Sequence, residues 1–295
     1  MSERLGQLDL VFVVDNTGSM GPYIEATKTK ILEIIRTIKK EELCHRLRVG
    51  LVSYRDHPPQ EESYVTKKYE LTSETSKIEE NVKEMLAFGG GDGPEAVDTA
   101  LHVANRMEYL RESAKIMVLI GDAPPHGVES SGAWTQGSPD GKNWQDEAKI
   151  AFEKGIVIHT VGCFPEIAGY ENAVKVYEQI AKNTEGNFFP LTKAELLVKI
   201  ITGVAVEEID KIAIQQSILE EMKISMDEFS ADEDISESTI AELTSKMRSR
   251  GFTKRAVKHA PSVAGAAPES VSIESEEVTE KDVREALRQL KRKSA

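Results

Sequence analysis

Oxygen-bearing side chains follow directly on an apolar run near the start of the chain. Asp15, Thr17 and Ser19 lie in one short segment, and the preceding residues 8–14 are almost all apolar. Such a run predicts a strand that is covered on both faces of a parallel sheet, and open α/β sheets bind ligands at the carboxyl ends of their strands. One carboxylate and two hydroxyls, with no His or Cys among them, favour a hard cation such as Mg²⁺, Mn²⁺ or Ca²⁺.

The same segment has a second interpretation, as the beginning of a helix. Asn16, Thr17 and Ser19 are residue types whose side chains accept hydrogen bonds from the first backbone N–H groups of a helix. The segment alone therefore leaves helix capping and cation binding about equally supported.

Two further segments favour the cation. Residues 116–120 form a second apolar run, which leads directly into Gly121 and Asp122. Between the two runs, residues 89–95 form a glycine-rich loop, and its Pro94 and Glu95 predict the first turn of a helix. Three loops are thus expected to converge at one edge of the sheet.

Taken together, these three segments resemble the von Willebrand factor A domain over residues 6–205. In that family they form the metal-ion-dependent adhesion site. The resemblance implies that Asp15, Thr17 and Ser19 are the ligands from the first loop. It also implies that Asp122 is the carboxylate of the third loop, which is often bound through water.

The second loop departs from the commonest family pattern, which has a threonine at this place. Asp92-Gly93-Pro94-Glu95 is similar to the integrin β-subunit variant, in which a glutamate is the ligand. We therefore assign Glu95, with Thr99 as the alternative and Asp92 on the rim. The acidic residues that follow the serine in integrin β chains are missing here, so the adjacent calcium site of that subfamily is not expected.

The expected cofactor is Mg²⁺ or Mn²⁺, and the expected partner is a protein that offers a carboxylate. Protein ligands that fill only part of the octahedral shell of Mg²⁺ leave positions for water or for an acidic side chain. If Asp15, Glu95 and Asp122 all coordinated directly, the cation would be over-neutralised and would accept an acidic partner poorly. We therefore predict that Asp122 binds through water in the ligand-competent state.

Two histidines are expected on the same rim. His57 and His126 each follow a predicted strand, and the Arg-Asp-His and Asp-Ala-Pro segments around them are similar to intracellular A domains attached to atypical α-kinases. One interpretation is packing of the loops. The other is a polar floor for the ligand, with pH sensitivity near the ordinary histidine pKa of about 6.5. Trp134, in the long loop 127–142, is expected either to anchor a partner or to pack on its own rim.

The leading functional interpretation is a non-enzymatic module that binds an acidic side chain of a protein partner. The alternative is a substrate-presenting or regulatory component of an enzyme assembly of α-kinase-like or chelatase-like type. Direct phosphoester hydrolysis would need a general base, for which only His57 or His126 can be nominated. A haloacid-dehalogenase-type site would need an aspartate at position 17, where the chain has a threonine, and the sequence contains neither Gly-x-x-x-x-Gly-Lys-Ser/Thr nor Gly-x-Ser-x-Gly.

Alternating strands and helices predict an α/β fold: a doubly wound, mostly parallel six-stranded sheet with helices on both faces. The expected strands cover residues 8–14, 47–54, 67–71, 116–121, 156–162 and 187–190. The expected helices cover residues 21–40, 74–86, 95–109, 143–153, 170–182 and 192–225.

A helical appendix is expected after the A domain. Residues 206–256 read as a helical extension, with a capping-box pattern that begins at Thr239. Residues 257–278 are rich in Ala, Pro, Ser and Val and predict a flexible linker. Residues 279–293 predict an amphipathic helix that docks either on the domain or on a partner.

Composition limits the classes of partner. The chain has 295 residues and a net charge of −13, which argues against nucleic acid because such binders need a basic footprint. No apolar stretch reaches the length of about 20 residues that crosses a bilayer, and the first residues lack a secretory pattern. Two cysteines make no disulfide framework, and Cys163 is expected to be a buried thiol. A cytoplasmic protein without membrane insertion is therefore expected.

Overall fold

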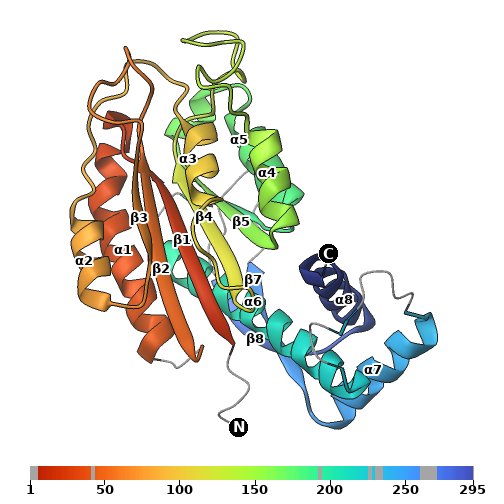
Figure 1. Ribbon diagram of the computed structural model, residues 1–295. Helices are drawn as coiled ribbons and strands as arrows, with labels where there is room; N and C mark the ends of the chain where they lie inside the picture. The colour runs from red at the N-terminus through yellow and green to blue at the C-terminus, as the bar shows by residue number, and fades with distance from the viewer. Residues whose placement is uncertain are drawn as a thin grey trace.

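The centre of the protein is a six-stranded sheet in the order β3-β2-β1-β4-β5-β6 (Figure 1). The computed structural model describes residues 6–40, 44–191, 195–224, 228–229, 235–259 and 271–294. Neighbouring strands run parallel, except that β3 is antiparallel to β2 at the edge. The predicted mostly parallel sheet is confirmed. The strands are β1 Gln7–Asp15, β2 Arg46–Tyr54, β3 Thr66–Thr72, β4 Ala114–Gly121, β5 Ile156–Cys163 and β6 Phe188–Leu191.

Helices cover both faces of this sheet, as expected. One face carries α1, α2 and α6, and the other carries α3, α4 and α5 (Figure 1). The helices are α1 Gly21–Lys40, α2 Thr75–Lys83, α3 Val97–Ala104, α4 Trp144–Glu153, α5 Ala173–Asn183 and α6 Glu195–Met222. Short 3₁₀ helices cover Gly18–Met20 and Glu166–Gly169.

The apolar run of β1 is buried because both faces of the strand are covered. Leu10 and Phe12 pack in the core beneath α1 and α6, whereas Val11 and Val13 pack in the core beneath α3, α4 and α5. Successive side chains of a strand point to opposite faces, so a central strand with two covered faces needs apolar residues at every position. This central place fixes the strand that ends at Asp15.

One predicted helix begins later than expected. Pro94 and Glu95 were expected in the first turn, but α3 begins at Val97 with Ala96 at its N-cap. The backbone N–H of Glu95 donates to the carbonyl of Pro124 at 2.9 Å. Glu95 therefore belongs to a short bridge between the second and third loops, and this holds its side chain at the sheet edge.

Helix α6 is shared between two hydrophobic cores. Its first half, which includes Ile200 and Val204, packs against the sheet, while Ile214 and Ile218 enter a separate core formed with α7 Glu237–Ser249 and α8 Glu280–Ser294. The helix therefore crosses the predicted boundary at residue 205 without a break. The lower part of Figure 1 shows α7, α8 and the second half of α6 beyond the sheet.

The apolar face of α8 packs within the same chain. Val283, Leu287 and Leu290 are buried in the core that α8 forms with α6 and α7. The helix begins after Thr279, whose N–H donates to Asp282 Oδ2 at 2.8 Å. Of the two expected docking places for this helix, the structure shows the one within the chain. The capping box predicted at Thr239 is wrong in position, because Ser236 caps α7 and accepts from the Thr239 N–H at 3.2 Å.

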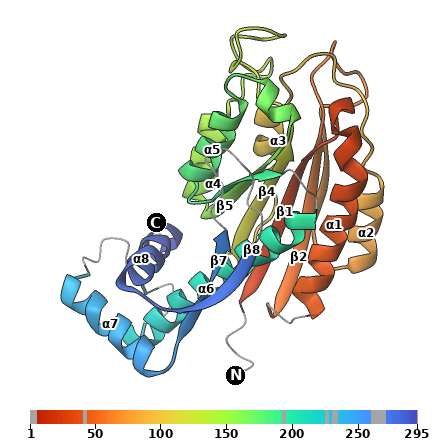
Figure 2. The same cartoon turned by 180° about the vertical axis from the view of Figure 1, so that it is seen from behind.

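The prediction of a flexible linker over residues 257–278 is wrong at both of its ends. β7 Thr253–His259 and β8 Val271–Glu277 form an antiparallel pair, and residues 260–270 lie outside the described residues. Figure 2 shows the pair crossing α6. Gly203 allows this crossing, since a Cβ there would lie 2.5 Å from Val257 Cγ2. Arg255 adds two bonds from its guanidinium to Asp210, at 3.0 and 2.6 Å. Composition alone could not reveal these contacts with α6.

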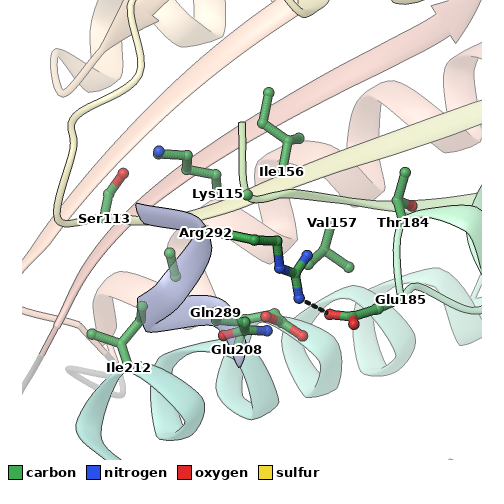
Figure 3. Close-up of a pocket in the computed structure, with 12 residues that line it drawn as sticks. Ser113, Lys115, Ile156, Val157, Thr184, Glu185, Glu208, Ile212, Gln289 and Arg292 are labelled. Atoms are coloured by element: carbon green, nitrogen blue, oxygen red, sulfur yellow. Dashed lines mark hydrogen bonds and ion pairs between the residues drawn. The ribbon is translucent and has the colours of Figure 1, made fainter. Parts of the chain in front are cut away.

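Helix α8 also reaches the base of the sheet. Arg292 donates to Glu185 at 2.8 Å and lies over the Phe152 ring at 4.1 Å. Figure 3 shows Arg292 and Gln289 of α8 beside Lys115, which lies at the beginning of β4. The appendix is therefore attached at the edge opposite the loops that follow Asp15 and Asp122. Across the described residues, no helix combines the length and apolarity needed to span a membrane.

Candidate metal centre

Asp15 and Asp122 lie at the carboxyl ends of adjacent strands. β1 and β4 pair in parallel, with Val14 opposite Ile120, and neighbouring strands are about 4.8 Å apart. Asp15 is the last residue of β1, and Asp122 directly follows β4. The first and third loops therefore meet at the upper edge of the sheet in Figure 1.

A chain of hydrogen bonds joins these two loops. Thr17 Oγ1 donates to Asp15 Oδ1 at 2.6 Å and lies 3.2 Å from Ser19 Oγ. Ser19 Oγ in turn donates to Asp122 Oδ1 at 3.0 Å. The structure thus brings together four of the predicted ligand residues. Thr17 makes no side-chain cap bond to the 3₁₀ helix that follows it, so the helix-capping interpretation is wrong for this residue.

Each predicted carboxylate ligand also has one oxygen without a partner. In the described part of the chain, the three buried atoms Asp15 Oδ2, Asp122 Oδ2 and Glu95 Oε2 accept no hydrogen bond. Buried polar atoms in native proteins almost always have a partner, and an exception often marks a missing water or ion. The unpartnered oxygens of Asp15 and Asp122, on either side of the Thr17 and Ser19 hydroxyls, are the pattern expected where a cation or water completes a site.

The pKa values of these carboxyls are raised. Burial, and then the charge of Asp122, raise the pKa of Asp15 to about 8. Burial likewise raises the pKa of Asp122 to about 6, against the hydrogen bond from Ser19. The pKa of Glu95 rises to about 11, because of burial and then the charge of Asp15. Without a counter-charge, burial and mutual repulsion oppose ionisation of the group.

Glycines bring the second loop against the first. The N–H of Gly18 donates to the carbonyl of Gly89 at 2.8 Å. Gly90 has φ of +79°, and a Cβ there would lie 2.8 Å from Glu95 Oε1 and 3.2 Å from Thr17 Cβ. Residues without a side chain are thus required where the second loop passes Thr17. This close passage places the Glu95 carboxyl beside the first loop.

The residues fit a cation held partly by hydroxyls and water. Within the described ranges, no three His, Cys, Asp or Glu side chains come close enough together to bind one metal ion. An all-carboxylate site is therefore not formed here. Thr17 and Ser19 supply two neutral oxygens between Asp15 and Asp122. Mg²⁺ sites commonly use one or two carboxylates and keep several waters.

Asp92 and Thr99 have other partners. Asp92 Oδ2 accepts a hydrogen bond from the backbone N–H of Ala133, so Asp92 joins the second loop to the long loop 127–142. Thr99 Oγ1 donates to Asp140 at 2.8 Å and lies 3.1 Å from His57 Nε2. The side chain of Thr99 thus belongs to the neighbouring histidine cluster, whereas Glu95 adjoins the first loop.

The histidines form a buried cluster with Trp134. His57 and His126 are 7% and 3% exposed, and the indole lies edge-on to both rings, at centroid distances of 5.9 and 4.9 Å. His126 Nε2 lies 2.7 Å from Asp56 Oδ1. Burial lowers the pKa of His57. These contacts favour the loop-packing interpretation for both histidines, and Trp134 packs on its own rim.

Two tyrosines of the site were missed from the sequence. A Cβ on Gly121 would lie 2.6 and 2.5 Å from the hydroxyls of Tyr54 and Tyr177, and 3.4 Å from Asp15 Cβ. Tyr177 donates to the carbonyl of Ala123 at 3.1 Å and so holds the third loop. Gly121 directly before Asp122 was the available signal, since a glycine at a buried strand end often allows a close neighbour.

Comparison with known proteins identifies the domain. A family model for the von Willebrand factor type A domain matches residues 9–202. Alpha-protein kinase vwkA of Dictyostelium discoideum is 31% identical over 142 residues, which are 47% of this chain and 22% of that protein. A putative ariadne-like RING finger protein R811 of Acanthamoeba polyphaga mimivirus is 30% identical over 119 residues, 40% of this chain and 11% of that protein. The chain therefore spans less than a quarter of the length of either relative.

Solved structures share the fold. The pilus adhesin SpaC of Lactobacillus rhamnosus GG, in its open conformation, matches with a TM-score of 0.53 at 17% identity, over 70% of this chain and 30% of that one. A von Willebrand factor type A protein of Catenulispora acidiphila matches with a TM-score of 0.50 at 14% identity, over 70% of this chain and 43% of that one. At these identities the likeness concerns the fold alone.

Proposed function

Because this chain belongs to the von Willebrand factor type A domain family, a family of protein-interaction modules, we propose that it binds an acidic side chain of a protein partner through a divalent cation. Mg²⁺ or Mn²⁺ would be held by Asp15, Thr17 and Ser19, with Glu95 and Asp122 beside it. When bound, the cation supplies a hard Lewis acid with an open position for a carboxylate oxygen.

One observation carries this proposal: a carboxylate–hydroxyl–hydroxyl–carboxylate chain runs from Asp15 to Asp122 at the sheet edge, and both end groups keep an oxygen without a donor. Asp15 Oδ1 also accepts the backbone N–H of Thr17 at 2.8 Å, whereas Asp15 Oδ2 and Asp122 Oδ2 accept no backbone N–H of the described residues, as the oxygens of helix-capping residues would. Oxygens that are buried, unpartnered and close to other carboxylates are stabilised by a positive charge.

The roles of the residues follow from their charges. Thr17 and Ser19 are neutral and orient the two aspartates, so they leave the positive charge of the cation intact. We propose that Asp15 coordinates directly, because it ends β1 and is rigidly placed. Asp122 is proposed to act through water, because its Oδ1 already accepts the hydroxyl of Ser19. A cation neutralised by fewer direct carboxylates accepts an acidic partner more readily.

Calorimetric titration with Mg²⁺ tests the site. Wild type should bind the ion, and Asp15→Ala and Ser19→Ala should each weaken binding by at least about tenfold, a loss typical of changed metal-site residues. Ser272→Ala, at an exposed serine of β8, is the matched control and should bind like wild type. Equal binding by all four proteins would remove the assignment.

An array of peptides tests the partner chemistry. Peptides with a central glutamate should bind in Mg²⁺ and be released by chelation, whereas matched peptides with a central glutamine should bind in neither condition. Glutamine keeps the shape of the side chain but lacks the anionic oxygen that a hard cation prefers. If the two sets bound alike, the carboxylate-binding proposal would fail.

A second candidate function is supported by the similarity to the alpha-protein kinase vwkA. The module would then present a substrate to a catalytic subunit, or regulate that subunit. Affinity capture in Mg²⁺, compared with capture by Ser19→Ala, separates the candidates: a partner with kinase or ATP-hydrolysing activity that depends on Ser19 supports this second function. Partners without such activity favour the simple interaction module.

The same proposal includes a protein partner and a place in the cytoplasm. A net charge of −13 disfavours nucleic acid. Cys44 and Cys163 are both free thiols, and Cys163 is buried. Free thiols persist in the reducing cytosol. Microscopy of the tagged full chain would test the localisation.

A further inference from the structure

Two large apolar side chains lie exposed beside the candidate metal centre. Among the described residues, the large hydrophobic residues classed as exposed are Leu86, Phe88 and Ile273, at 61%, 66% and 42% exposure. Two of these three lie two positions apart in the segment between α2 and the glycine loop. Isolated exposed apolar residues are common on proteins, so their position must decide whether they have a role.

The backbone places this pair on the rim of the metal centre. The N–H of Phe88 donates to the carbonyl of Asn16 at 2.9 Å, directly beside the first loop. Gly90, two residues further on, lies against Thr17 and Glu95. Two residues of extended chain span at most about 7 Å. Phe88 therefore lies next to the first loop and within about 7 Å of the glycine that passes Thr17 and Glu95.

The buried side chain of Arg55 holds this segment in place. Its guanidinium donates to the carbonyl of Leu86 at 3.0 Å and to Ser63 Oγ at 2.6 Å. The same group lies 5.4 Å from the centre of the Phe88 ring and 4.5 Å from the centre of the Tyr64 ring. The apolar pair is thus presented on fixed backbone, which reduces the entropy lost when a partner binds.

An exposed lysine, Lys67, lies on the same aromatic cluster as the pair. Lys67 Nζ lies 4.8 Å from the centre of the Tyr64 ring, whereas the charge of the buried Arg55 is balanced by Glu61, whose Oε2 lies 3.8 Å from Arg55 Nη1. Aromatic residues supported by arginine are typical centres of binding energy in interfaces. Leu86 and Phe88 thus lie together, on supported backbone, next to the candidate metal centre, whereas a singly exposed apolar residue has no such neighbours.

We propose that Leu86 and Phe88 form an apolar contact surface that selects the partner, which is a peptide segment with an apolar side chain one to three positions from the metal-bound carboxylate. The spacing follows from the chain length, because an extended peptide advances about 3.3 Å per residue and the pair lies within about 7 Å of the metal loops. This inference rests on the proposed function and adds the kind of sequence that the site selects.

The peptide array tests this inference on the full chain. Peptides with a fixed central glutamate carry Leu, Phe, Ser or Lys at each of the three positions on either side. In Mg²⁺, the wild type should bind Leu and Phe peptides at least about tenfold better than Ser peptides, since a buried aromatic contact contributes more than about 1 kcal/mol. Leu86→Ser/Phe88→Ser should lose this preference while binding Mg²⁺ like wild type.

Ile273→Ser is the matched control, because it removes the third exposed apolar residue from β8 in the appendix. It should keep both the metal dependence and the apolar preference. Glutamate peptides bound in Mg²⁺ without any apolar preference would overturn the inference and leave the proposed function intact. Binding that ignores Mg²⁺ or does not distinguish glutamate from glutamine would overturn both. Thermal unfolding of each variant checks that the fold is retained.

Discussion

His159 should make the fold sensitive to acid. It lies in β5 and is 1% exposed, with its ring stacked against Phe189 at a centroid distance of 6.1 Å. Its Nδ1 accepts a hydrogen bond from the backbone N–H of Asn187 at 3.2 Å. Burial, and then the positive charge of Lys211, lower its pKa from 6.5 to about 3. Protonation would place a cation in the core and remove the acceptor for Asn187.

The sign and size of the change in folding stability with pH follow from the difference between the folded and unfolded pKa values of His159. A histidine whose folded pKa is lowered contributes stability that is complete above its unfolded pKa of about 6.5 and is lost as the pH falls towards the folded value. Between about pH 7.5 and about pH 5, only the unfolded state takes up a proton at this residue. The loss at about pH 5 is then about 1.5 pH units at 1.36 kcal/mol each, or about 2 kcal/mol.

Urea unfolding at both pH values, with a chelator present, measures this loss. Because carboxyls also titrate in this range, the quantity of interest is the difference between the wild type and His159→Gln. The variant should lose about 2 kcal/mol less than the wild type on acidification. His45→Gln, at an exposed histidine, is the control and should behave like the wild type. If His159→Gln lost as much stability as the wild type, His159 would not be held neutral by the fold and the reasoning would be refuted.

Three further experiments test the packing. Gly89→Ala should cost about 1 to 3 kcal/mol, because φ is +76° and the new Cβ would collide with the carboxylate of Glu61; unchanged urea unfolding would contradict the strained placement of this loop. Gly203→Ala should destabilise the crossing of β7 over α6 by about 1 to 3 kcal/mol, and Val257→Ala should partly restore it; a purely additive double mutant would show that the two residues do not clash. Leu290→Ala should cost about 2 to 5 kcal/mol through a cavity in the appendix core, and hydrogen exchange should locate the loss in α7 and α8 rather than in the sheet.

The sequence by itself determined the sheet and most of the first and third loops of the candidate metal centre. The apolar runs that end at Asp15 and Gly121 could only be strands covered on both faces, and parallel strands place their carboxyl ends at one edge. These sequence patterns predict the structure correctly because the residues that favour a strand locally are also the residues that are buried in the core. The alternation between Phe12 and Val13 shows this, since each residue enters a different core.

Other features depended on contacts between distant segments. Residues 257–259 and 271–277 read as linker because their composition is poor in large apolar groups, but pairing with each other and contact with α6 order them. The first turn of α3 was misplaced because the backbone of Glu95 bonds to Pro124 on another loop. Tyr54 and Tyr177 belong to no motif, and the Arg-Asp-His segment assigned no role to Arg55, since these roles arise only where strands and loops meet.

One physical reason separates the features that the sequence predicts from those that it does not. A pattern in the sequence predicts structure when the stabilising interaction is local, or when it acts on a whole face of a strand or helix. Burial acts in this way on the apolar residues before Asp15. Directional contacts between loops, such as the bonds that join Ser19 to Asp122 and Arg55 to Leu86, depend on distances that only the folded chain defines. The residue types at the candidate metal centre were therefore fixed by the sequence, whereas their convergence, and the exposed pair beside them, were decided by the tertiary structure.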